Sequence, residues 1–272
     1  MMKNTFKSTL KSTLTALLMI VGAASSGGIH ASTIIADWNF GDASQTTLNN
    51  TVNSGVGSSW GTAITGIKTD GTGLLNINND GQGGSGTRSA YTDFDSVTSG
   101  MLSLYTRFAS WNPAGNGTMQ SFTMGFIEGN DFSTAEFSLA ATDSGYTLSG
   151  GVDAFGDGTA IGDTFSFSTW SPITVRLDVD LDLMRYLLAY DNGNGFVSIG
   201  SASIDSLTQG INSLRLSVDG DFANNPLSVD RVWVEQGRVS AVPEPGSLAM
   251  MLAGVMLLVL MSLRGQRRHT RG

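Results

Sequence analysis

The sequence predicts an all-β protein, an antiparallel jelly-roll sandwich over residues 32–240 with one apolar segment at each end of the chain. Three observations predict this fold. Short runs of alternating apolar and polar residues recur at spacings of about 8 to 12 residues, roughly twelve to fourteen in all. Clusters of Gly, Asn and Asp separate them, and glycine is abundant, at 35 of 272 residues. No helical periodicity is evident between the two apolar segments.

The first apolar segment has the pattern of a secretory signal peptide over residues 1–31. Three lysines precede it, Lys3, Lys7 and Lys11. The stretch from Leu14 to Ala24 is apolar, and small residues then lead to a cleavage position after Ala31. An uncleaved anchor helix is the alternative, but an apolar core of about eleven residues is short for a membrane span.

Along the body, alternation marks the strands in order. A first strand is expected at Asp37–Phe40, and further alternation appears at 102–108 and 122–126. From Ile173 to Leu183 the odd positions are apolar and the even positions polar, which predicts a strand with one buried and one wet face. A turn near 182–184, a strand at 185–190, hairpin chemistry at 191–195 and a strand at 196–199 complete a meander. The last strands are expected at 214–218 and 228–235.

The composition of residues 32–240 limits the partners and the chemistry. The segment carries eight basic and 22 acidic residues, a formal charge of −14, which repels nucleic acid and anionic lipid and favours divalent cations or neutral glycans. It contains no cysteine, so no disulfide stabilises it. The two histidines, His30 and His269, lie outside it, which excludes Ser-His-Asp and Cys-His catalysis and histidine-ligated zinc.

The C-terminal segment combines three parts. Val242, Pro243, Glu244 and Pro245 form an acidic motif between prolines, and an apolar run from Leu248 to Leu263 follows. With Gly246 and Ser247 the run reaches roughly 27 Å at about 1.5 Å per residue, enough for a thin bilayer, which predicts a transmembrane helix over 247–263. Four arginines close the chain and predict a cytoplasmic tail at 264–272: Arg264, Arg267, Arg268 and Arg271. A plain single-span anchor is the alternative interpretation.

Residues 241–272 resemble the PEP-CTERM sorting signal of Gram-negative bacteria, which an exosortase reads. The resemblance implies an exosortase-type processing protease as partner, acting near Val242–Pro245. It also implies export by a Gram-negative bacterium, a transient inner-membrane intermediate, and a final position at the cell surface or in the extracellular matrix.

The body resembles a concanavalin A-like lectin/glucanase domain of the laminin-G type. The residues that carry this resemblance are the strand Asp37–Phe40, the meander Trp170–Ile199 and the closing strand Ser228–Glu235. The resemblance implies one structural calcium where the first and last strands meet, with Asp230 as the matching ligand and a bridge to the Asp37–Asp42 region. The 19 aspartates of the chain suit such a hard cation. A solvent-facing or capping Asp230 is the alternative.

Carboxylate-only catalysis stays open, because laminarinase-type enzymes share the proposed fold and use paired glutamates on one strand. The sequence departs from that pattern, since Glu128, Glu136 and Glu235 stand apart. The set that comes nearest to this pattern is Asp178, Asp180 and Asp182, three carboxylates on one strand face. The alternative interpretation is that these aspartates only form the solvent-exposed face of the strand.

Aromatic residues beside Gly/Ser/Asn-rich stretches are candidates for stacking on sugars. Trp60 and Trp111, with Tyr91, are the candidate carbohydrate-binding residues, and loop anchoring is the alternative. Trp38, Trp170 and Trp233 occupy strand-like settings and are expected in the core.

The sequence therefore predicts a non-catalytic envelope or extracellular-matrix protein, delivered by its tail, with extracellular polysaccharide as the candidate ligand of its sandwich. A divergent glycoside hydrolase or polysaccharide lyase that uses aspartates alone is the alternative, and an adhesin or self-assembling matrix protein is another.

Overall fold

A computed structural model describes residues 32–51, 56–61, 66–77, 88–111, 120–128, 132–151, 161–204, 207, 209–220, 222 and 227–237. The predicted signal peptide, sorting motif, transmembrane helix and arginine cluster lie outside these residues. Within the described ranges, no helix has the length and apolar character that a membrane span requires.

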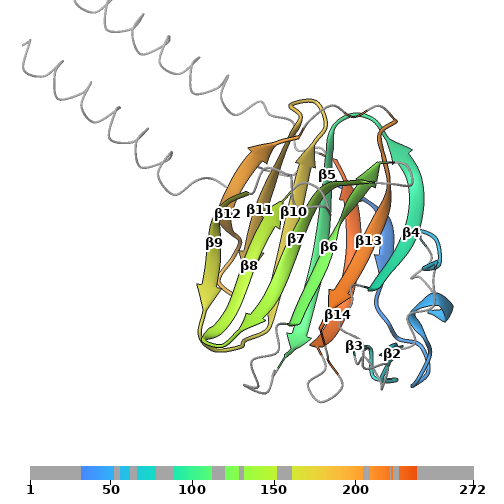
Figure 1. Ribbon diagram of the computed structural model, residues 1–272. Helices are drawn as coiled ribbons and strands as arrows, with labels where there is room; N and C mark the ends of the chain where they lie inside the picture. The colour runs from blue at the N-terminus through green and yellow to red at the C-terminus, as the bar shows by residue number, and fades with distance from the viewer. Residues whose placement is uncertain are drawn as a thin grey trace, which may run out of the picture. The chain divides into compact units, whose positions relative to one another are not determined.

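The described chain folds into two antiparallel sheets that pack face to face (Figure 1). The first sheet has eight strands, in the order β12 (Val197–Ser203), β11 (Arg185–Asp191), β10 (Ile173–Asp180), β5 (Met101–Ser110), β14 (Leu227–Gln236), β3 (Leu75–Ile77) and β2 (Ile67–Thr69), with β1 (Thr33–Trp38) also paired to β14. The second has six, in the order β4 (Arg88–Val97), β13 (Ile211–Asp219), β6 (Gln120–Glu128), β7 (Phe132–Thr142), β8 (Gly145–Gly151) and β9 (Ile161–Phe167).

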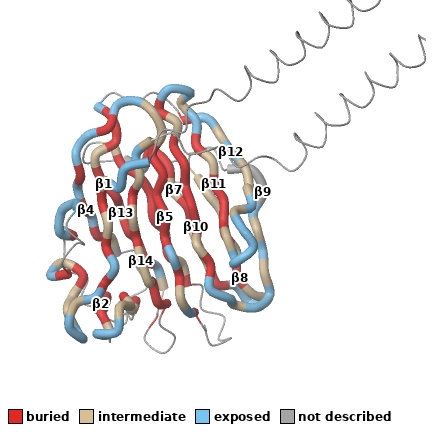
Figure 2. The backbone as a smooth tube through the Cα atoms, turned by 180° about the vertical axis from the view of Figure 1, so that it is seen from behind, coloured by how far each residue is buried: buried red, intermediate tan, exposed pale blue. Residues whose placement is uncertain are grey.

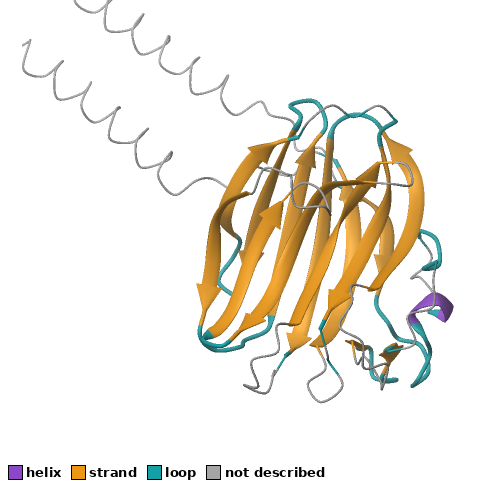
Figure 3. Ribbon diagram, viewed as in Figure 1, coloured by secondary structure: helices purple, strands orange, loops and turns teal. Residues whose placement is uncertain are grey.

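A single short 3-10 turn, Leu48–Asn50, is the only helical element that the structure describes (Figure 3). The predicted all-β antiparallel sandwich is confirmed.

The predicted meander is confirmed as β10, β11 and β12. The first strand is shorter than the alternation predicts, because β10 ends at Asp180 and residues Leu181 to Met184 form the turn. The Asp180 carboxylate accepts hydrogen bonds from the backbone N–H groups of Asp182 and Leu183, at 3.2 and 3.0 Å. This local bonding competes with the sheet ladder and ends the strand, which leaves Leu183 exposed.

The core lies between the two sheets and is built from the inward-facing residues of both. Phe108 of the eight-stranded sheet meets Phe122 and Phe137 of the six-stranded sheet edge to face, with ring centroids 5.2 and 6.3 Å apart. The buried core residues extend from Ala36 to Val234, so the sandwich segment carries its own hydrophobic core. Figure 2 shows that long stretches of β5 and β10 are buried.

Candidate functional site

The outer face of the six-stranded sheet carries a hollow of about 210 Å³. Its lining comes from β4, β13, β6 and β7 and consists mainly of hydroxyl and charged side chains: Ser89, Ser121, Thr123, Glu136, Arg215, Ser217, Val218 and Asp219. The polar residues alternate with inward-facing core residues, as expected for a strand with one wet face.

Five hydroxyl side chains form one row across this face. The strand register places Ser217 opposite both Ser89 and Thr123, Thr123 opposite Ser138, and Ser138 opposite Ser149. The hydroxyls of Ser89 and Ser217 lie 2.7 Å apart, and Thr123 donates to Ser138 over 3.4 Å. Neighbouring strands are about 4.8 Å apart, so the hydroxyl row extends for roughly 19 Å.

A second hollow, of about 350 Å³, lies at the β8 and β9 end of the same sheet. Thr147 and Ser166 line it, and the register connects them through Ala140 to Ser121 of the first hollow. Further hydroxyls and two aromatic residues complete its lining: Thr142, Ser144, Ser168, Tyr146 and Phe167. The outward-facing hydroxyls that line the two hollows therefore lie on the same sheet face.

A charged pair crosses the sheet beside the hydroxyl row. Arg215 lies opposite Gly125, and Gly125 lies opposite Glu136. The Arg215 guanidinium donates to the Glu136 carboxylate over 2.7 Å, and both side chains are largely buried, with 12% and 16% exposed. A Cβ at Gly125 would lie only 2.3 Å from the Ala135 carbonyl oxygen, so this position requires glycine for the close approach of β6 and β7.

Tyr91 lies at the β4 end of the row that contains Arg215, Gly125 and Glu136. It lies opposite Arg215 and is 40% exposed, so its ring is available to solvent on the same sheet face. The backbone N–H of Gly61 donates to the Tyr91 carbonyl over 2.6 Å, which ties the loop that carries Trp60 to this strand.

Glu136 and Asp219, the two carboxylates that line the first hollow, do not form a glycosidase pair. Glu136 is bound by Arg215, and Asp219 lies four residues beyond Arg215 on β13, about 13 Å further along the strand. The carboxyl pairs of glycoside hydrolases lie roughly 5 to 9.5 Å apart. The arrangement is suited to hydrogen bonding with a polyol.

Trp60 and Trp111 do not present a ring to solvent, in contrast to the prediction from sequence. Trp60 is 2% exposed and packs against Trp38 with ring centroids 5.2 Å apart, and Trp111 is 1% exposed and stacks on Phe222. Both residues anchor their segments to the core, so their predicted role in stacking on sugars is wrong for this structure.

Trp233 is also placed differently from the prediction. Trp38 is buried and Trp170 packs against the core, as expected, but Trp233 lies on the outer face of the eight-stranded sheet. The reason is a β-bulge in β14, where the register shifts on both sides of Val229 and re-aims the following residues. Val232 and Val234 consequently face the core.

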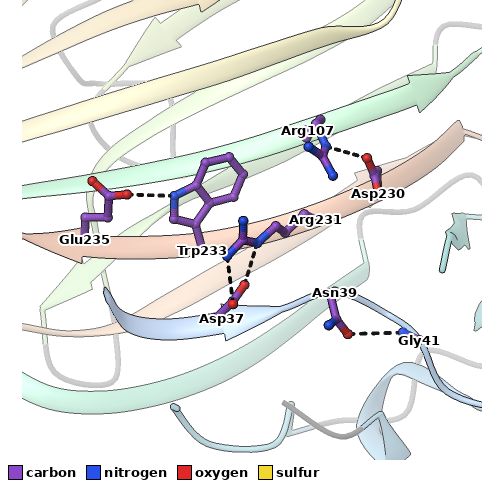
Figure 4. A network of polar contacts seen from close by, with 8 residues as sticks. All are labelled: Asp37, Asn39, Gly41, Arg107, Asp230, Arg231, Trp233 and Glu235. Atoms are coloured by element: carbon purple, nitrogen blue, oxygen red, sulfur yellow. Dashed lines mark hydrogen bonds and ion pairs between the residues drawn. The ribbon is translucent and has the colours of Figure 1, made fainter. Parts of the chain in front are cut away.

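Ion pairs hold Asp230 and Asp37, two of the carboxylates named in the calcium prediction (Figure 4). Arg231 donates two hydrogen bonds to the Asp37 carboxylate, at 2.8 and 2.9 Å, and Arg107 forms an ion pair with Asp230. Among the residues that the structure describes, no three His, Cys, Asp or Glu side chains gather as a metal site. The Asp230 and Asp37 carboxylates each bind an arginine in this structure, and calcium at Asp230 stays a prediction.

The three aspartates of the alternative catalytic prediction do not share one wet face. Asp178 is buried, accepts a hydrogen bond from Ser103 at 2.7 Å and pairs with Arg176 at 3.0 Å. Burial raises the pKa of Asp178, although the neighbouring Arg176 opposes the shift. Asp180 caps the turn after β10, and Asp182 accepts the backbone N–H of Gly100.

An arginine–aromatic ladder covers the centre of the eight-stranded sheet on its outer face. It consists of Arg231, Trp233, Tyr105, Phe196 and Arg176. Arg231 lies 4.7 Å above the Trp233 ring, Trp233 stacks on Tyr105 at 4.6 Å, and Arg176 lies 4.5 Å above Phe196. Burial raises the pKa of Tyr105 to about 12, so this phenol stays protonated.

No protein-family model matches the chain, and no curated protein matches its sequence. Its fold is similar to the CBM2 module of the evolved Dit of Lactobacillus casei BL23 phage J-1, with a TM-score of 0.55, 8% identity, and coverage of 77% of this chain and 97% of that one. It is also similar to an endo-1,3-β-glucanase from Streptomyces sioyaensis, with a TM-score of 0.51, 16% identity, and coverage of 78% and 99%. At these identities the likeness concerns the fold alone, an antiparallel β-sandwich.

Proposed function

We propose that this protein is an exported, non-catalytic envelope or matrix protein that binds a neutral polysaccharide through the outer face of its six-stranded sheet. The observation that carries the proposal is the hydroxyl row, flanked by the Arg215–Glu136 pair and the exposed ring of Tyr91. Hydroxyl and charged groups fix the hydroxyls of a sugar, and an aromatic ring packs against its apolar face.

An extended chain suits this face better than a single sugar. The hydroxyl row runs across five strands for roughly 19 Å, and the outward-facing Thr147 and Ser166 of the second hollow add hydroxyls at the β8 and β9 end of the same face. The segment's formal charge of −14 disfavours an anionic chain, so a neutral polymer is the preferred ligand class. The fold similarity to a CBM2 module and to a glucanase supports a carbohydrate ligand as a class.

The proposed route to the envelope uses both ends of the chain. Residues 1–31 direct export, and the apolar run from Leu248 to Leu263 holds the chain in the inner membrane with the arginines as the stop. An exosortase-type protease then acts near Pro243–Pro245, where the prolines keep the backbone extended and accessible. Replacing Pro243, Glu244 and Pro245 by alanine is expected to leave export intact and to trap full-length protein in the membrane. Release at the wild-type rate would contradict this route.

A binding experiment tests the proposed ligand. Residues 32–240 are screened on a glycan array, and the affinity for the best neutral glucan is then measured by calorimetry for wild type, Tyr91→Ala and Val197→Ala. Val197 is 49% exposed but lies on β12 of the other sheet, so it is the matched control. We expect Tyr91→Ala to lose about tenfold in affinity, equivalent to about 1.4 kcal/mol, and Val197→Ala to bind as wild type.

Two results would contradict the proposed function. Equal affinity of Tyr91→Ala and wild type for the glucan would exclude the outer face of the six-stranded sheet as the binding surface. Release of oligosaccharides from the bound glucan would favour the hydrolase alternative.

A further inference from the structure

The outer face of the eight-stranded sheet concentrates the basic residues of the domain. Four of the eight arginines and lysines between residues 32 and 240 lie there, and each pairs with an aspartate. The pairs are Arg107–Asp230, Arg176–Asp178, Arg185–Asp180 and Arg231–Asp37. The eight charges of these four pairs balance, whereas residues 32–240 as a whole carry a formal charge of −14.

The centre of the same face has the burial pattern of a covered sheet. Residues 102–106 of β5 and 175–179 of β10 are all buried, on the outer as well as on the core side (Figure 2). Consecutive buried residues are typical of strands that are covered on both faces. The arginine–aromatic ladder provides this cover and fixes the rotamers of its members through stacking and ion pairs.

The face has the composition of a protein interface. Tyr, Trp and Arg are the residues enriched at the centres of interfaces, and the ladder consists of these types with one Phe. Arg107 and Arg231 keep 48% and 31% of their side chains exposed beside the Trp233 ring (Figure 4). Because the ladder is already ordered, little side-chain entropy is lost when a partner packs against it.

We propose that the outer face of the eight-stranded sheet binds a second copy of this chain. Charge complementarity supports this proposal: positive and negative side chains alternate across β5, β14 and β1 in the order Arg107, Asp230, Arg231 and Asp37, so a two-fold related copy can set each exposed arginine against a carboxylate. An approach through surfaces where carboxylates are in excess is disfavoured, because such surfaces repel each other. The resulting dimer leaves both six-stranded faces open and points them in opposite directions, so that it can link two polysaccharide chains.

The first test measures the mass of residues 32–240 in solution by sedimentation equilibrium over a range of concentrations. Wild type is expected to dimerise reversibly, and Arg107→Glu is expected to weaken the dimer at least tenfold, because it sets a carboxylate against Asp230. Arg215→Glu makes the same charge change on the six-stranded face and is expected to keep the dimer while it weakens glycan binding. A monomer at every concentration, or equal weakening by both variants, would overturn the proposal.

A second test maps the interface and does not depend on charge reversal. Because the chain has no cysteine, a single introduced cysteine can carry a nitroxide spin label. Thr174→Cys places the label on the eight-stranded face, and Ser138→Cys places it on the six-stranded face. The proposal requires a shorter distance between copies for the Thr174 label than for the Ser138 label, and the reverse order would overturn it. Circular dichroism confirms that each variant is folded.

Discussion

Replacing Gly125 by alanine is expected to strain the centre of the six-stranded sheet. The new Cβ would lie 2.3 Å from the Ala135 carbonyl oxygen and 2.4 Å from the Glu136 Cβ, more than 1 Å short of an ordinary contact. Relief requires β6 and β7 to separate by about that distance, which lengthens a ladder hydrogen bond of about 2.9 Å beyond 3.5 Å. Overpacking costs roughly 1–3 kcal/mol, and each lost hydrogen bond costs about 1 kcal/mol more.

We therefore expect Gly125→Ala to lower the free energy of unfolding by about 3 kcal/mol. At roughly 2–4 °C per kcal/mol for a domain of this size, the Tm falls by about 6–12 °C, measured by circular dichroism on residues 32–240. Gly151 lies on the other side of Glu136 in the same row, and a Cβ there meets nothing within 4 Å. Gly151→Ala is therefore the matched control, with no loss of stability. A Gly125→Ala Tm within about 2 °C of wild type, or an equal fall in both variants, would refute the steric argument.

Three further predictions concern buried and turn residues. Arg176→Met alone is expected to lower the free energy of unfolding by about 3–5 kcal/mol, because it leaves Asp178 buried without its ion pair. The double variant Arg176→Met with Asp178→Leu is expected to lose less, and urea unfolding of wild type and the two variants measures this order. The side-chain hydrogen bond from Thr72 lowers the pKa of Asp70, so this carboxylate stabilises the fold at neutral pH and its contribution is lost as the pH falls through its folded-state pKa. The stability difference between wild type and Asp70→Asn should accordingly shrink from pH 7 to pH 3. Trp111→Ala is expected to lower the free energy of unfolding by about 3–5 kcal/mol, because it leaves a cavity in the core. The glycan affinity of the folded protein, measured by calorimetry below the Tm, is expected to stay unchanged.

The sequence was sufficient to predict the architecture and the meander. Alternation from Ile173 onward identifies β10, and the Asp191–Gly195 cluster identifies the hairpin that follows it. Both signals are local, since side-chain periodicity and turn chemistry depend on neighbouring residues alone. The inward-facing residues of the six-stranded sheet were found for the same reason.

The position of Trp233 could not be predicted in this way. Alternation in a strand predicts whether its odd-numbered or its even-numbered residues face the core, but a bulge exchanges the two sets partway along the strand. The bulge in β14 lies near Val229, and the run from Ser228 to Glu235 contains no glycine or proline that marks it. Trp60 was missed for a different reason, because a glycine-rich loop can fold back and bury its aromatic residue in the core.

The hydroxyl row has no signal in the linear sequence. Ser89 and Ser217 are 128 residues apart, and they meet only because β4 and β13 pair in one particular register. Serine and threonine are common on wet strand faces, so each residue alone indicates nothing about a ligand. Tyr91 was selected from sequence for its glycine-rich surroundings, and the structure places it exposed on this same face.

The two outer faces differ in the length of their side chains, and this difference explains why one is densely covered and the other is hollowed. Alternation predicts that both faces are wet, yet Arg176 and Asp178 are buried while Ser138 and Ser149 stay partly exposed. Long guanidinium and aromatic side chains reach their neighbours across a strand and cover the sheet, which leaves a dense surface that suits another protein. Serine and threonine are too short to cover the strands between them, so they leave hollows with hydroxyls at the base that suit a polyol chain. Exchanging the composition of the faces should therefore exchange their properties: arginine and tyrosine at outward positions of β6 and β7 would fill the hollows, even though the alternation of the strands stays the same.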